Sequence, residues 1–173
     1  MQGILTDIDG NTLVSIKHSP ESEIKEIYRP FTHCLAVIKA DNDFLLGWNE
    51  YRKRYEIFGG CIEENETPRE CITRECYEEL GISDIDFEYI GVMELLLKPD
   101  YFSDKERIEY GGLYGITLHN IHLDEIYSQI KDKDEIGKLD LYRNIKGKEP
   151  IAEIDEKLLE YFHSKEDVIV ERN

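Results

Sequence analysis

The sequence predicts an α/β (α+β) fold, in which helices flank a central mixed sheet as a layered sandwich. Extended apolar runs alternate with helical segments along the chain, and such mixed elements bury their apolar faces by stacking in layers. The length of 173 residues is enough for one ordinary domain. The 40% of residues that are hydrophobic can fill a core, and the 34% that are charged can cover its surface.

The first fifty residues are predicted to form a hairpin, a short helix and a pair of strands. Two short extended runs surround the Asp-Gly-Asn sequence at 9–11, and Asp-Gly suits the positive φ of a hairpin turn. The string ESEIKEIY indicates a short helix that ends before Pro30. HCLAVIKA and DFLLGWNE follow as a strand pair joined at 41–42. We expect residues 1–30 to be an extension and residues 31–173 to be the main domain.

The remaining segments alternate between strands and helices. RYEIFGGCIE is a third extended run, broken by its two glycines. DFEYIGVMELLLKP and RIEYGGLYGITLHNI are strands, and the continuous apolar residues of the first suit a strand covered on both faces. LDEIYSQI indicates a helix and EIGKLDLY a strand. AEIDEKLLEYFHSK is a closing helix with Ile154, Leu158 and Phe162 at fourfold spacing.

Composition and charge exclude several classes of protein. No apolar run approaches the ~18 residues that span a bilayer, and the N-terminus lacks the basic start and apolar body of a signal peptide. We therefore expect a cytoplasmic protein without a membrane partner. The net charge of −17 repels polyanions, which argues against binding a nucleic acid polymer. A small anionic substrate is compatible with this charge if a divalent cation mediates its binding.

The four cysteines are predicted to be buried free thiols. They stand at positions 34, 61, 71 and 76, without the secretory context that favours disulfides. There is no C-x2-C pair, so the spacing does not fit a zinc site.

A strongly acidic segment is predicted to be a well-bounded helix. Thr67 and Glu70 have the spacing of a capping box, in which each side chain accepts from the other residue's backbone N–H, and Pro68 suits the first helical turn. Gly81 can adopt the left-handed conformation that ends a helix. The buried stripe is predicted to consist of Cys71, Ile72, Cys76 and Leu80.

Three carboxylates share one face of this helix, and we expect that face to lie outside the apolar stripe. Glu75, Glu78 and Glu79 stand at positions i, i+3 and i+4. Like charges at this spacing cost a helix about 0.2 to 0.5 kcal/mol per pair. A hard divalent cation such as Mg2+ would compensate, because it prefers carboxylate oxygens. The alternative is an ordinary solvated acidic face. The order of a Gly-Gly strand end, a loop and a capped helix favours the metal site.

These residues resemble the signature of the Nudix hydrolase superfamily, G-x5-E-x7-R-E-U-x-E-E-x-G-U, where U is an aliphatic residue. The match begins at Gly60, continues through Glu66 and runs from Arg74 to Ile82. Every charged and glycine position of the signature is filled. The departure is Cys76 at an aliphatic position, which is mild because free cysteine packs as a small hydrophobe. The resemblance implies the family's α/β/α sandwich.

The resemblance also implies an activity and roles for the matched residues. The activity is cleavage of a phosphoanhydride bond in a nucleoside diphosphate linked to another moiety, with Mg2+ or Mn2+ as cofactor. Glu78 and Glu79 would be the main carboxylate ligands, and Glu75 would be a further ligand or the base for water. The carbonyl of Gly60 would bind the metal, and Arg74 would orient Glu75.

Two further acidic positions follow from the same resemblance. Glu66 would be partly structural, and in many relatives an acidic residue later in the chain completes the site. We assign that position to Glu135, and its neighbour Asp134 is the alternative.

The residues just before the glycine pair are candidates for substrate binding. Arg52 and Arg54, in the basic run with Lys53, would meet the substrate phosphates, and Trp48 and Tyr51 would stack on a base. The alternatives are a solvated basic loop and ordinary aromatic packing.

The sequence leaves three functional hypotheses. The first is a hydrolase of a nucleoside triphosphate, an oxidised nucleotide or a nucleotide sugar. The second is a binding module with the same fold that senses a nucleotide without cutting it. The third is an enzyme like isopentenyl diphosphate isomerase, since the opening DIDGN followed by a strand from His33 looks like that branch. A homodimer built through the N-terminal hairpin is an additional hypothesis.

Overall fold

The structure is a computed structural model that describes the backbone of residues 3–171 and the side chains of residues 3–163. The strands are β1 (Leu5–Thr6), β2 (Thr12–Lys17), β3 (Phe31–Ala40), β4 (Asp43–Asn49), β5 (Arg54–Glu56), β6 (Phe58–Cys61), β7 (Glu88–Leu97), β8 (Arg107–Leu118) and β9 (Ile136–Leu141). The helices are α1 (Ile24–Ile27, after a 3-10 turn at Glu21–Glu23), α2 (Pro68–Leu80), α3 (Leu123–Gln129), α4 (Tyr142–Ile145) and α5 (Glu153–Glu171).

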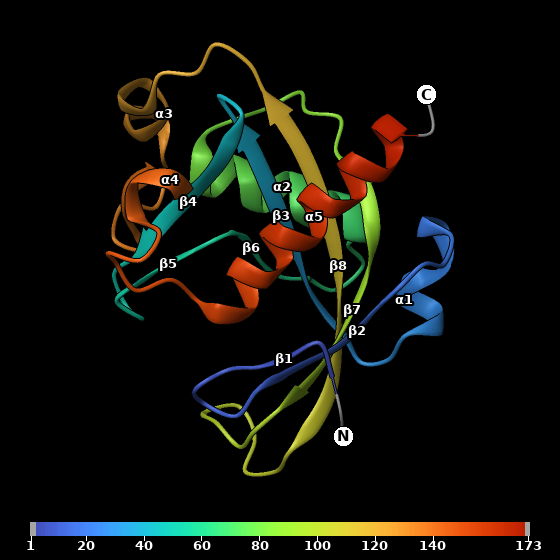
Figure 1. Ribbon diagram of the computed structural model, residues 1–173. Coiled ribbons are helices and arrows are strands. Elements are labelled where there is room, and N and C mark those ends of the chain that lie inside the picture. Colours follow the sequence, from blue (N-terminus) through green and yellow to red (C-terminus); the bar gives the residue numbers. More distant parts are fainter. Residues whose placement is uncertain (1–2, 172–173) are drawn as a thin grey trace.

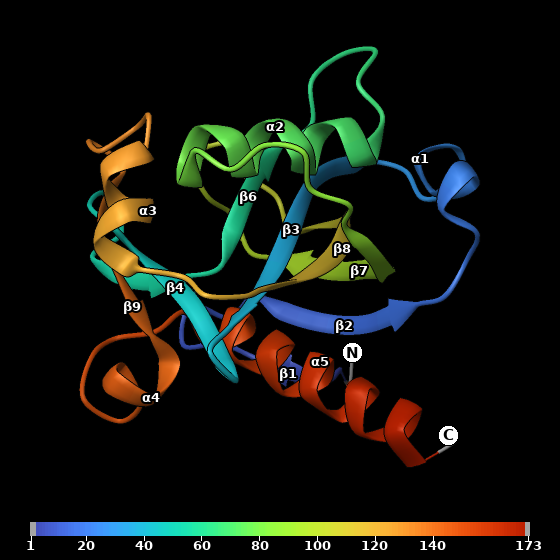
Figure 2. The same ribbon diagram turned by 90° about the horizontal axis from the view of Figure 1, so that it is seen from above.

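The predicted layered α+β architecture is confirmed. Helix α2 covers one face of the sheet and α5 covers the other, so the sheet lies between two helical layers (Figure 1; Figure 2). None of the helices in the described part of the chain is both long enough and apolar enough to cross a membrane.

The described strands form one mixed nine-stranded sheet. Its main order is β1-β2-β7-β8-β3-β4-β5, with β6 paired to β3 and β9 paired to β4. Strands β3 and β8 run parallel, whereas β7 pairs antiparallel with β2 and with β8. The N-terminal hairpin is therefore joined to the central sheet through β2. The division at residue 30 stays a prediction, and residues 1–2 and 172–173 of the two predicted ranges lie outside the described residues.

Strand β3 changes partner along one of its edges. Residues 33–36 pair with β6, and residues 38–40 pair with β4 on the same side, because β8 occupies the opposite edge. Strands β4 and β6 therefore separate from each other along β3. This separation opens a cleft in the sheet, and the candidate site lies there.

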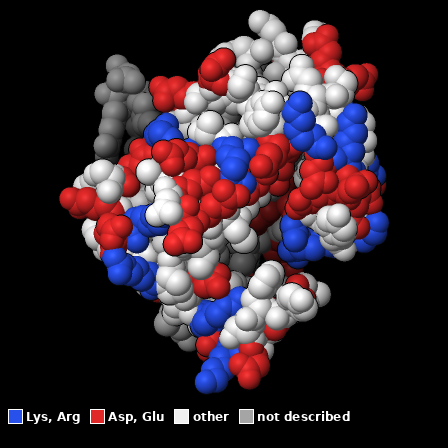
Figure 3. Space-filling model, turned by 180° about the vertical axis from the view of Figure 1, so that it is seen from behind, with Lys and Arg blue, Asp and Glu red and all other residues white. Residues whose placement is uncertain are grey.

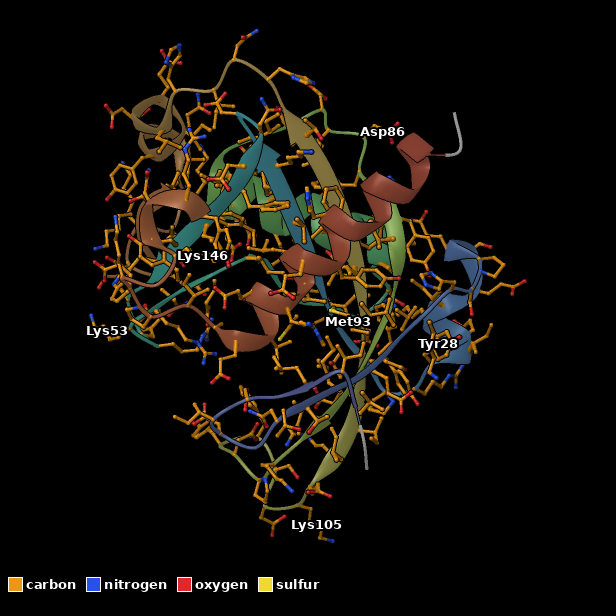
Figure 4. All side chains as sticks on the ribbon, viewed as in Figure 1. Tyr28, Lys53, Asp86, Met93, Lys105 and Lys146 are labelled. Atoms are coloured by element: carbon orange, nitrogen blue, oxygen red, sulfur yellow. The ribbon has the colours of Figure 1, made fainter. Side chains whose placement is uncertain are left out.

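The core has two halves, one under each helical layer. Along β3, Ala36 and Ile38 pack on the α2 side, whereas Val37 packs on the α5 side, as the twofold alternation of a strand requires. Met93, labelled in Figure 4, belongs to the α5 side. The α5 side also contains Leu158, Leu159 and Phe162, and the α2 side contains Cys71, Ile72, Cys76 and Leu80.

Helix α2 begins and ends where the sequence predicts. The Thr67 hydroxyl accepts from the Glu70 N–H at 3.1 Å, and the Glu70 carboxylate accepts from the Thr67 N–H at 3.0 Å, which completes the capping box. Gly81 closes the helix at a φ of +66°. Local chemistry alone therefore fixes both ends of the helix that carries the candidate carboxylates.

Two local expectations differ from the structure, and one helix was not expected. The run RYEIFGGCIE is interrupted at Ile57 and not at its glycines, because the Ile57 N–H donates to the Asp155 carboxylate instead of to a strand. All four cysteines are free, but Cys61 is exposed, so the prediction that all are buried is wrong for that residue. The short helix α4 has no counterpart in the sequence prediction.

The capping box provides a test of the fold. We expect Thr67→Ala to lower the free energy of unfolding by about 1 kcal/mol, because it removes the hydroxyl that satisfies an N-terminal N–H of α2. Thr73→Ala is a matched control on the exposed face of the same helix, and we expect it to leave stability unchanged within about 0.5 kcal/mol. Urea denaturation followed by circular dichroism measures both. Equal effects of the two substitutions would contradict a role for the cap.

Candidate metal and phosphate site

Arg74 is the centre of a network that holds the acidic loop against α2. Its Nε and Nη2 donate to the two Glu66 carboxylate oxygens at 2.7 and 3.0 Å, and its Nη2 also donates to the Cys61 carbonyl at 3.0 Å. Its Nη1 donates to Glu75 Oε1 at 2.9 Å. These pairs lower the pKa of Glu66 to about 2 and raise that of Arg74. The guanidinium therefore fixes the orientation of Glu75, as a bidentate arginine can.

Glu79 is buried, unlike most carboxylates on a helix. Its side chain lies beside the apolar stripe, and the residue is 6% exposed. The Glu79 carboxylate accepts one hydrogen bond from the Gly59 N–H at 2.9 Å. Burial raises its pKa well above the ordinary value, and the charges of Glu75 and Glu135 raise it further. The expectation that all three acidic residues lie outside the apolar stripe is therefore wrong for Glu79.

Glu75 occupies a similar environment at the start of the same face. Burial raises its pKa, Arg74 opposes that shift, and the nearby charges of Glu78 and Glu135 add to it. The Glu78 side chain is 49% exposed and lies 3.4 Å from Arg74 Nη1. The structure therefore brings a buried, a half-buried and an exposed carboxylate together on one helical face.

Glu135 joins these carboxylates from a distant part of the chain. It lies just before β9, where its carbonyl accepts from the Glu50 N–H at 2.8 Å and its Oε1 accepts from Asn49 Nδ2 at 3.3 Å. Asn49 is 1% exposed, and its Oδ1 also accepts from the N–H groups of Tyr51 and Arg52. Asn49 thus ties Glu135 to the turn after β4. The neighbouring Asp134 is exposed and does not line the cavity described next.

A cavity of about 520 Å³ opens where β4 and β6 separate. Figure 3 shows acidic side chains gathered around a hollow on the face seen from behind. Glu79, Gly59 and Glu135 line this cavity, whereas Glu75 lies next to Gly60 at its side. The other lining residues are Thr32, His33, Leu35, Asn49, Arg52, Arg54, Glu56, Ile57, Cys61, Leu95, Leu97, Asp100, Phe102, Arg107, Glu109, Ile136 and Asp155.

Positions 59 and 60 in β6 require glycine for different structural reasons. Gly59 has a φ of +143°, and a Cβ there would lie 2.0 Å from the Cys34 carbonyl oxygen. A Cβ on Gly60 would lie 2.5 Å from the Glu75 carboxylate. The Gly60 carbonyl accepts from Cys71 Sγ at 3.7 Å, and Gly59 is the glycine whose backbone contacts an acidic side chain. The assignment of the Gly60 carbonyl as a metal ligand stays a prediction.

The basic residues before the glycines are held by a carboxylate that the sequence analysis did not select. Arg52 donates through Nε and Nη2 to Glu56 at 2.7 to 3.0 Å, and Arg54 Nε donates to Glu56 at 2.8 Å. Both arginines line the cavity. Lys53 pairs with Glu50 and points away from the body of the protein (Figure 4). Glu56 could have been selected from the sequence, because it is a charged residue between two apolar residues of an extended run. Both of these neighbours, Tyr55 and Ile57, are buried.

Trp48 and Tyr51 do not line the cavity. Trp48 packs edge-on against Tyr55 at 5.2 Å between ring centroids, and Lys138 Nζ lies 4.9 Å from the centroid of its ring. Tyr51 is 71% exposed. The structure therefore does not bring these two aromatic rings to the carboxylates.

Asp155 is a further acidic residue that the sequence analysis did not select. It lies in the first turn of α5, and its Oδ2 accepts from the Ile57 N–H at 3.0 Å. Burial, reinforced by the charge of Glu56, raises its pKa to about 7. An acidic residue three positions before the buried Leu158, on the apolar side of an amphipathic helix, was the available signal.

The donor set fits a hard divalent cation. Among the side chains that the structure describes, no three His, Cys, Asp or Glu residues are already arranged around a metal position. The charges of Glu75 and Glu135 nevertheless raise the pKa of Glu79, and the charge of Glu135 raises that of Glu75, so the ionised carboxylates repel one another. A cation among their oxygens would relieve this repulsion, and carboxylate oxygens are the ligands that Mg2+ prefers.

The raised pKa of Asp155 predicts a specific pH dependence of stability. Because its pKa is about 7 in the folded chain and about 4 when unfolded, unfolding releases a proton between these values. The free energy of unfolding of the metal-free protein therefore falls as the pH rises from about 4 to about 7. Asp155→Asn keeps an acceptor for the Ile57 N–H and removes this contribution. We expect the variant to match the wild type near pH 4 and to exceed it near pH 8 in urea denaturation. Parallel curves for the two proteins would exclude a titrating Asp155.

Comparison with known families and structures supports one assignment. A family model described as NUDIX domain matches residues 28–161. No curated protein matches the sequence significantly.

The fold is also similar to that of several solved structures, of which three are described. The NUDIX domain of Shewanella oneidensis NrtR, complexed with ADP ribose, is 15% identical, with a TM-score of 0.60 over 85% of this chain and 99% of that one. A MutT NUDIX hydrolase from Burkholderia pseudomallei is 18% identical, with a TM-score of 0.57 over 74% and 94%. A mutant of the Bacillus subtilis pyrophosphohydrolase BsRppH is 19% identical, with a TM-score of 0.56 over 87% and 85%.

At these identities the likeness to solved structures establishes the fold, whereas the family model matches most of the chain directly. The family model matches residues 28–161, which include the glycine strand and the capped acidic helix. The chain therefore belongs to the NUDIX domain family.

Proposed function

We propose that the protein is a divalent-metal-dependent hydrolase of a phosphoanhydride bond in a nucleoside diphosphate linked to another moiety. The substrate classes are nucleoside triphosphates, oxidised nucleotides and nucleotide sugars. The observation that carries the proposal is the buried Glu79, which opens onto the cavity beside Glu135 while its neighbour Glu75 is locked by Arg74. Burying mutually repelling carboxylates costs stability unless a cation or a chemical role compensates.

The cofactor in this proposal is Mg2+ or Mn2+. Glu75, Glu78 and Glu79 would hold it, together with a backbone carbonyl of the glycine pair, at Gly60 as the sequence predicts or at the neighbouring Gly59. When bound, such an ion supplies charge neutralisation at the diphosphate oxygens and lowers the pKa of water. Both functions require the carboxylates that hold the ion to be ionised when it binds.

The side chains of the protein have separable roles in this proposal. Arg74 is a positioning residue, because it contacts Glu75 and Glu66 and does not line the cavity. Glu135 lines the cavity from the segment just before β9, where it would complete the acidic site. Arg52 and Arg54 supply positive charge at the cavity, moderated by Glu56, which both contact. This charge would attract phosphate to a protein whose net charge is −17.

A nucleotide-binding module without catalysis is the second candidate. It is favoured by the likeness to a NUDIX domain complexed with ADP ribose. The complete set of Glu75, Glu78, Glu79 and Arg74 favours the hydrolase, because binding alone does not require a buried carboxylate with a raised pKa. Of the three hypotheses from the sequence, the isomerase is the one for which the fold and the cavity add no support.

The cellular setting and the remaining partners stay predictions. The high negative charge supports a protein that binds a small nucleotide derivative and no nucleic acid polymer. A cytoplasmic location without a membrane partner and a homodimer through the N-terminal hairpin belong to the same proposal.

Replacement of Glu79 tests the metal site directly. We expect Glu79→Gln to lower Mg2+-dependent release of phosphate or pyrophosphate from a panel of nucleoside diphosphate derivatives at least ~100-fold. The variant should remain folded, because the amide still accepts from the Gly59 N–H and no longer places a charge in a buried position. It should also lose the Mg2+-induced rise in melting temperature that we expect for the wild type.

Asp134→Asn is the matched control for this experiment. Asp134 is acidic and adjacent to Glu135, but it is exposed and outside the cavity lining. We expect its turnover and its response to Mg2+ to equal those of the wild type. Tight nucleotide binding by a wild type that releases nothing from the panel would support the binding module instead.

The glycine pair gives a second test, in which one substitution should lower turnover and the adjacent one should lower stability. Gly60→Ala places a methyl group against the flexible end of Glu75, so we expect a folded protein whose turnover falls by about tenfold or more because Glu75 is displaced. Gly59→Ala places a methyl group against the backbone at a positive φ, so we expect a loss of several kcal/mol of stability. Thermal melts and turnover assays separate the two outcomes. A fully active Gly60→Ala protein would remove Glu75 from the mechanism.

A further inference from the structure

The N-terminal extension reaches the turn that carries Glu66. Lys25, on α1, donates from Nζ to the backbone carbonyl of Glu66 at 2.6 Å, across 41 positions of the chain. The neighbouring Ile24 is fully buried in the α2 side of the core, so α1 is anchored next to this contact. Lys25 itself is half-buried. Its ammonium group therefore contacts the turn from a fixed position.

A second contact joins the extension to α2 itself, and Figure 2 shows α1 beside the N-terminal end of that helix. Arg69 donates through Nε and Nη2 to the two carboxylate oxygens of Glu21 at 2.8 and 2.9 Å. The Tyr114 hydroxyl donates to Glu21 Oε1 at 3.0 Å, and Arg69 Nη1 donates to the Phe87 carbonyl at 2.7 Å. The extension thus contacts both α2 and the turn that precedes it.

The turn at 63–66 has few other supports on this side. A cavity of about 460 Å³ separates the extension from the turn and the first residues of α2. Lys25 and Glu66 both line this cavity, and residues 63–65 are exposed. Within the turn, the Glu66 N–H donates to the Glu63 carbonyl at 3.2 Å. A hydrogen bond from Lys25, rather than packed side chains, therefore holds the turn against the extension.

A shift of Glu66 would be transmitted to Glu75. Arg74 donates to both Glu66 oxygens and to Glu75 Oε1, so one planar guanidinium sets the position of both carboxylates. Glu66 is therefore held by two cations, Arg74 at its carboxylate and Lys25 at its carbonyl. A displacement of about 1 Å at a reacting group can cost about 100-fold in rate.

The contacts of Lys25 differ from those that attach the extension to the fold. Ile24 supplies buried apolar surface, and Glu21 supplies an ion pair with α2. The described hydrogen bond of Lys25 is to the turn alone. Lys25 also precedes residue 28, where the match to the NUDIX domain model begins. The support of the turn therefore comes from outside the matched residues.

We propose that Lys25 is a positioning residue for the acidic site, where it holds the turn at Glu66 so that Arg74 keeps Glu75 in place. The inference rests on the proposed function, since it gives the N-terminal extension a part in the same metal site. Neither Lys25 nor Glu66 lines the 520 Å³ cavity, so neither would contact the substrate there. Loss of the contact should therefore change metal binding and kcat and leave KM nearly unchanged.

Two replacements of Lys25 test this inference. Lys25→Met keeps an aliphatic chain and removes the donor, whereas Lys25→Arg keeps a donor. Binding of Mn2+ alone, followed by the paramagnetic resonance signal of the free ion, requires no turnover. We expect Lys25→Met to weaken Mn2+ binding and to lower kcat by about tenfold each, with KM within about twofold of the wild type. Lys25→Arg should restore most of both losses.

Arg29→Met is the matched control. Arg29 is a cation of the same extension, and its described hydrogen bonds are to Glu26 within that extension. We expect the control to bind Mn2+ and to turn over as the wild type does, and thermal melts should show that all three variants are folded. A Lys25→Met protein with unchanged Mn2+ affinity and kcat would overturn the inference, as would an equal loss in Arg29→Met or a wild type that binds no Mn2+.

The same measurements separate this inference from the proposed function. An active wild type with an unaffected Lys25→Met variant would refute the role of Lys25 and leave the hydrolase intact. A wild type that hydrolyses nothing in the panel, but binds Mn2+ about tenfold more tightly than Lys25→Met does, would refute the hydrolase and support the role of Lys25.

Discussion

The close approach of β6 to α2 is the constraint on which the candidate site depends. Gly59 lies against the backbone of β3, where a Cβ would be 2.0 Å from the Cys34 carbonyl oxygen. Its N–H therefore faces the helix and donates to Glu79. One residue later, the space that a Cβ of Gly60 would fill is taken by the Glu75 carboxylate. Two glycines thus allow one helix face to reach the strand, because a larger residue would clash with the backbone of β3 at position 59 and would displace the Glu75 carboxylate at position 60.

This approach creates an electrostatic problem that the protein solves only in part. Arg74 compensates Glu66 and Glu75, and its pairs lower the pKa of Glu66 to about 2. Glu79 receives one N–H and no cationic side chain among its described hydrogen bonds and ion pairs. Burial raises its pKa well above the ordinary value, and the charges of Glu75 and Glu135 add to that shift. A buried carboxylate without a cationic partner lowers the stability of the fold. Such groups are typical of functional sites, where the charge is needed for binding or catalysis.

The sequence predicts those parts of the structure that short-range chemistry determines. The two ends of α2 depend on Thr67, Glu70 and Gly81, which interact within a few residues of one another. The turn at 41–42 is similarly local, since both residues adopt the positive φ that Asn and Asp tolerate. The matched signature predicts which carboxylates gather on the helix. These features would be recognised in any chain with the same local strings.

The features that could not be predicted depend on contacts between distant residues. The break at Ile57 requires Asp155, 98 positions later, to accept its N–H. The placement of Glu135 depends on Asn49, 86 positions earlier. Glu79 is a different case, because it stands three residues after Cys76 and seven after Ile72, so helical periodicity already places it beside the buried stripe.

The division between local and distant contacts also divides the roles within the cavity. Glu75, Glu78, Glu79 and the two glycines come from one continuous segment, the strand β6 and the helix α2, whereas Glu135 comes from the segment before β9. The opposite end is assembled from Arg107, Asp100 and Phe102, on a β7–β8 connection with no contact to that segment among the described hydrogen bonds. The loop can therefore change without disturbing the carboxylates. In a chain built in this way the loop can vary while the carboxylate geometry is kept, because loops tolerate substitution better than a packed helix and strand do.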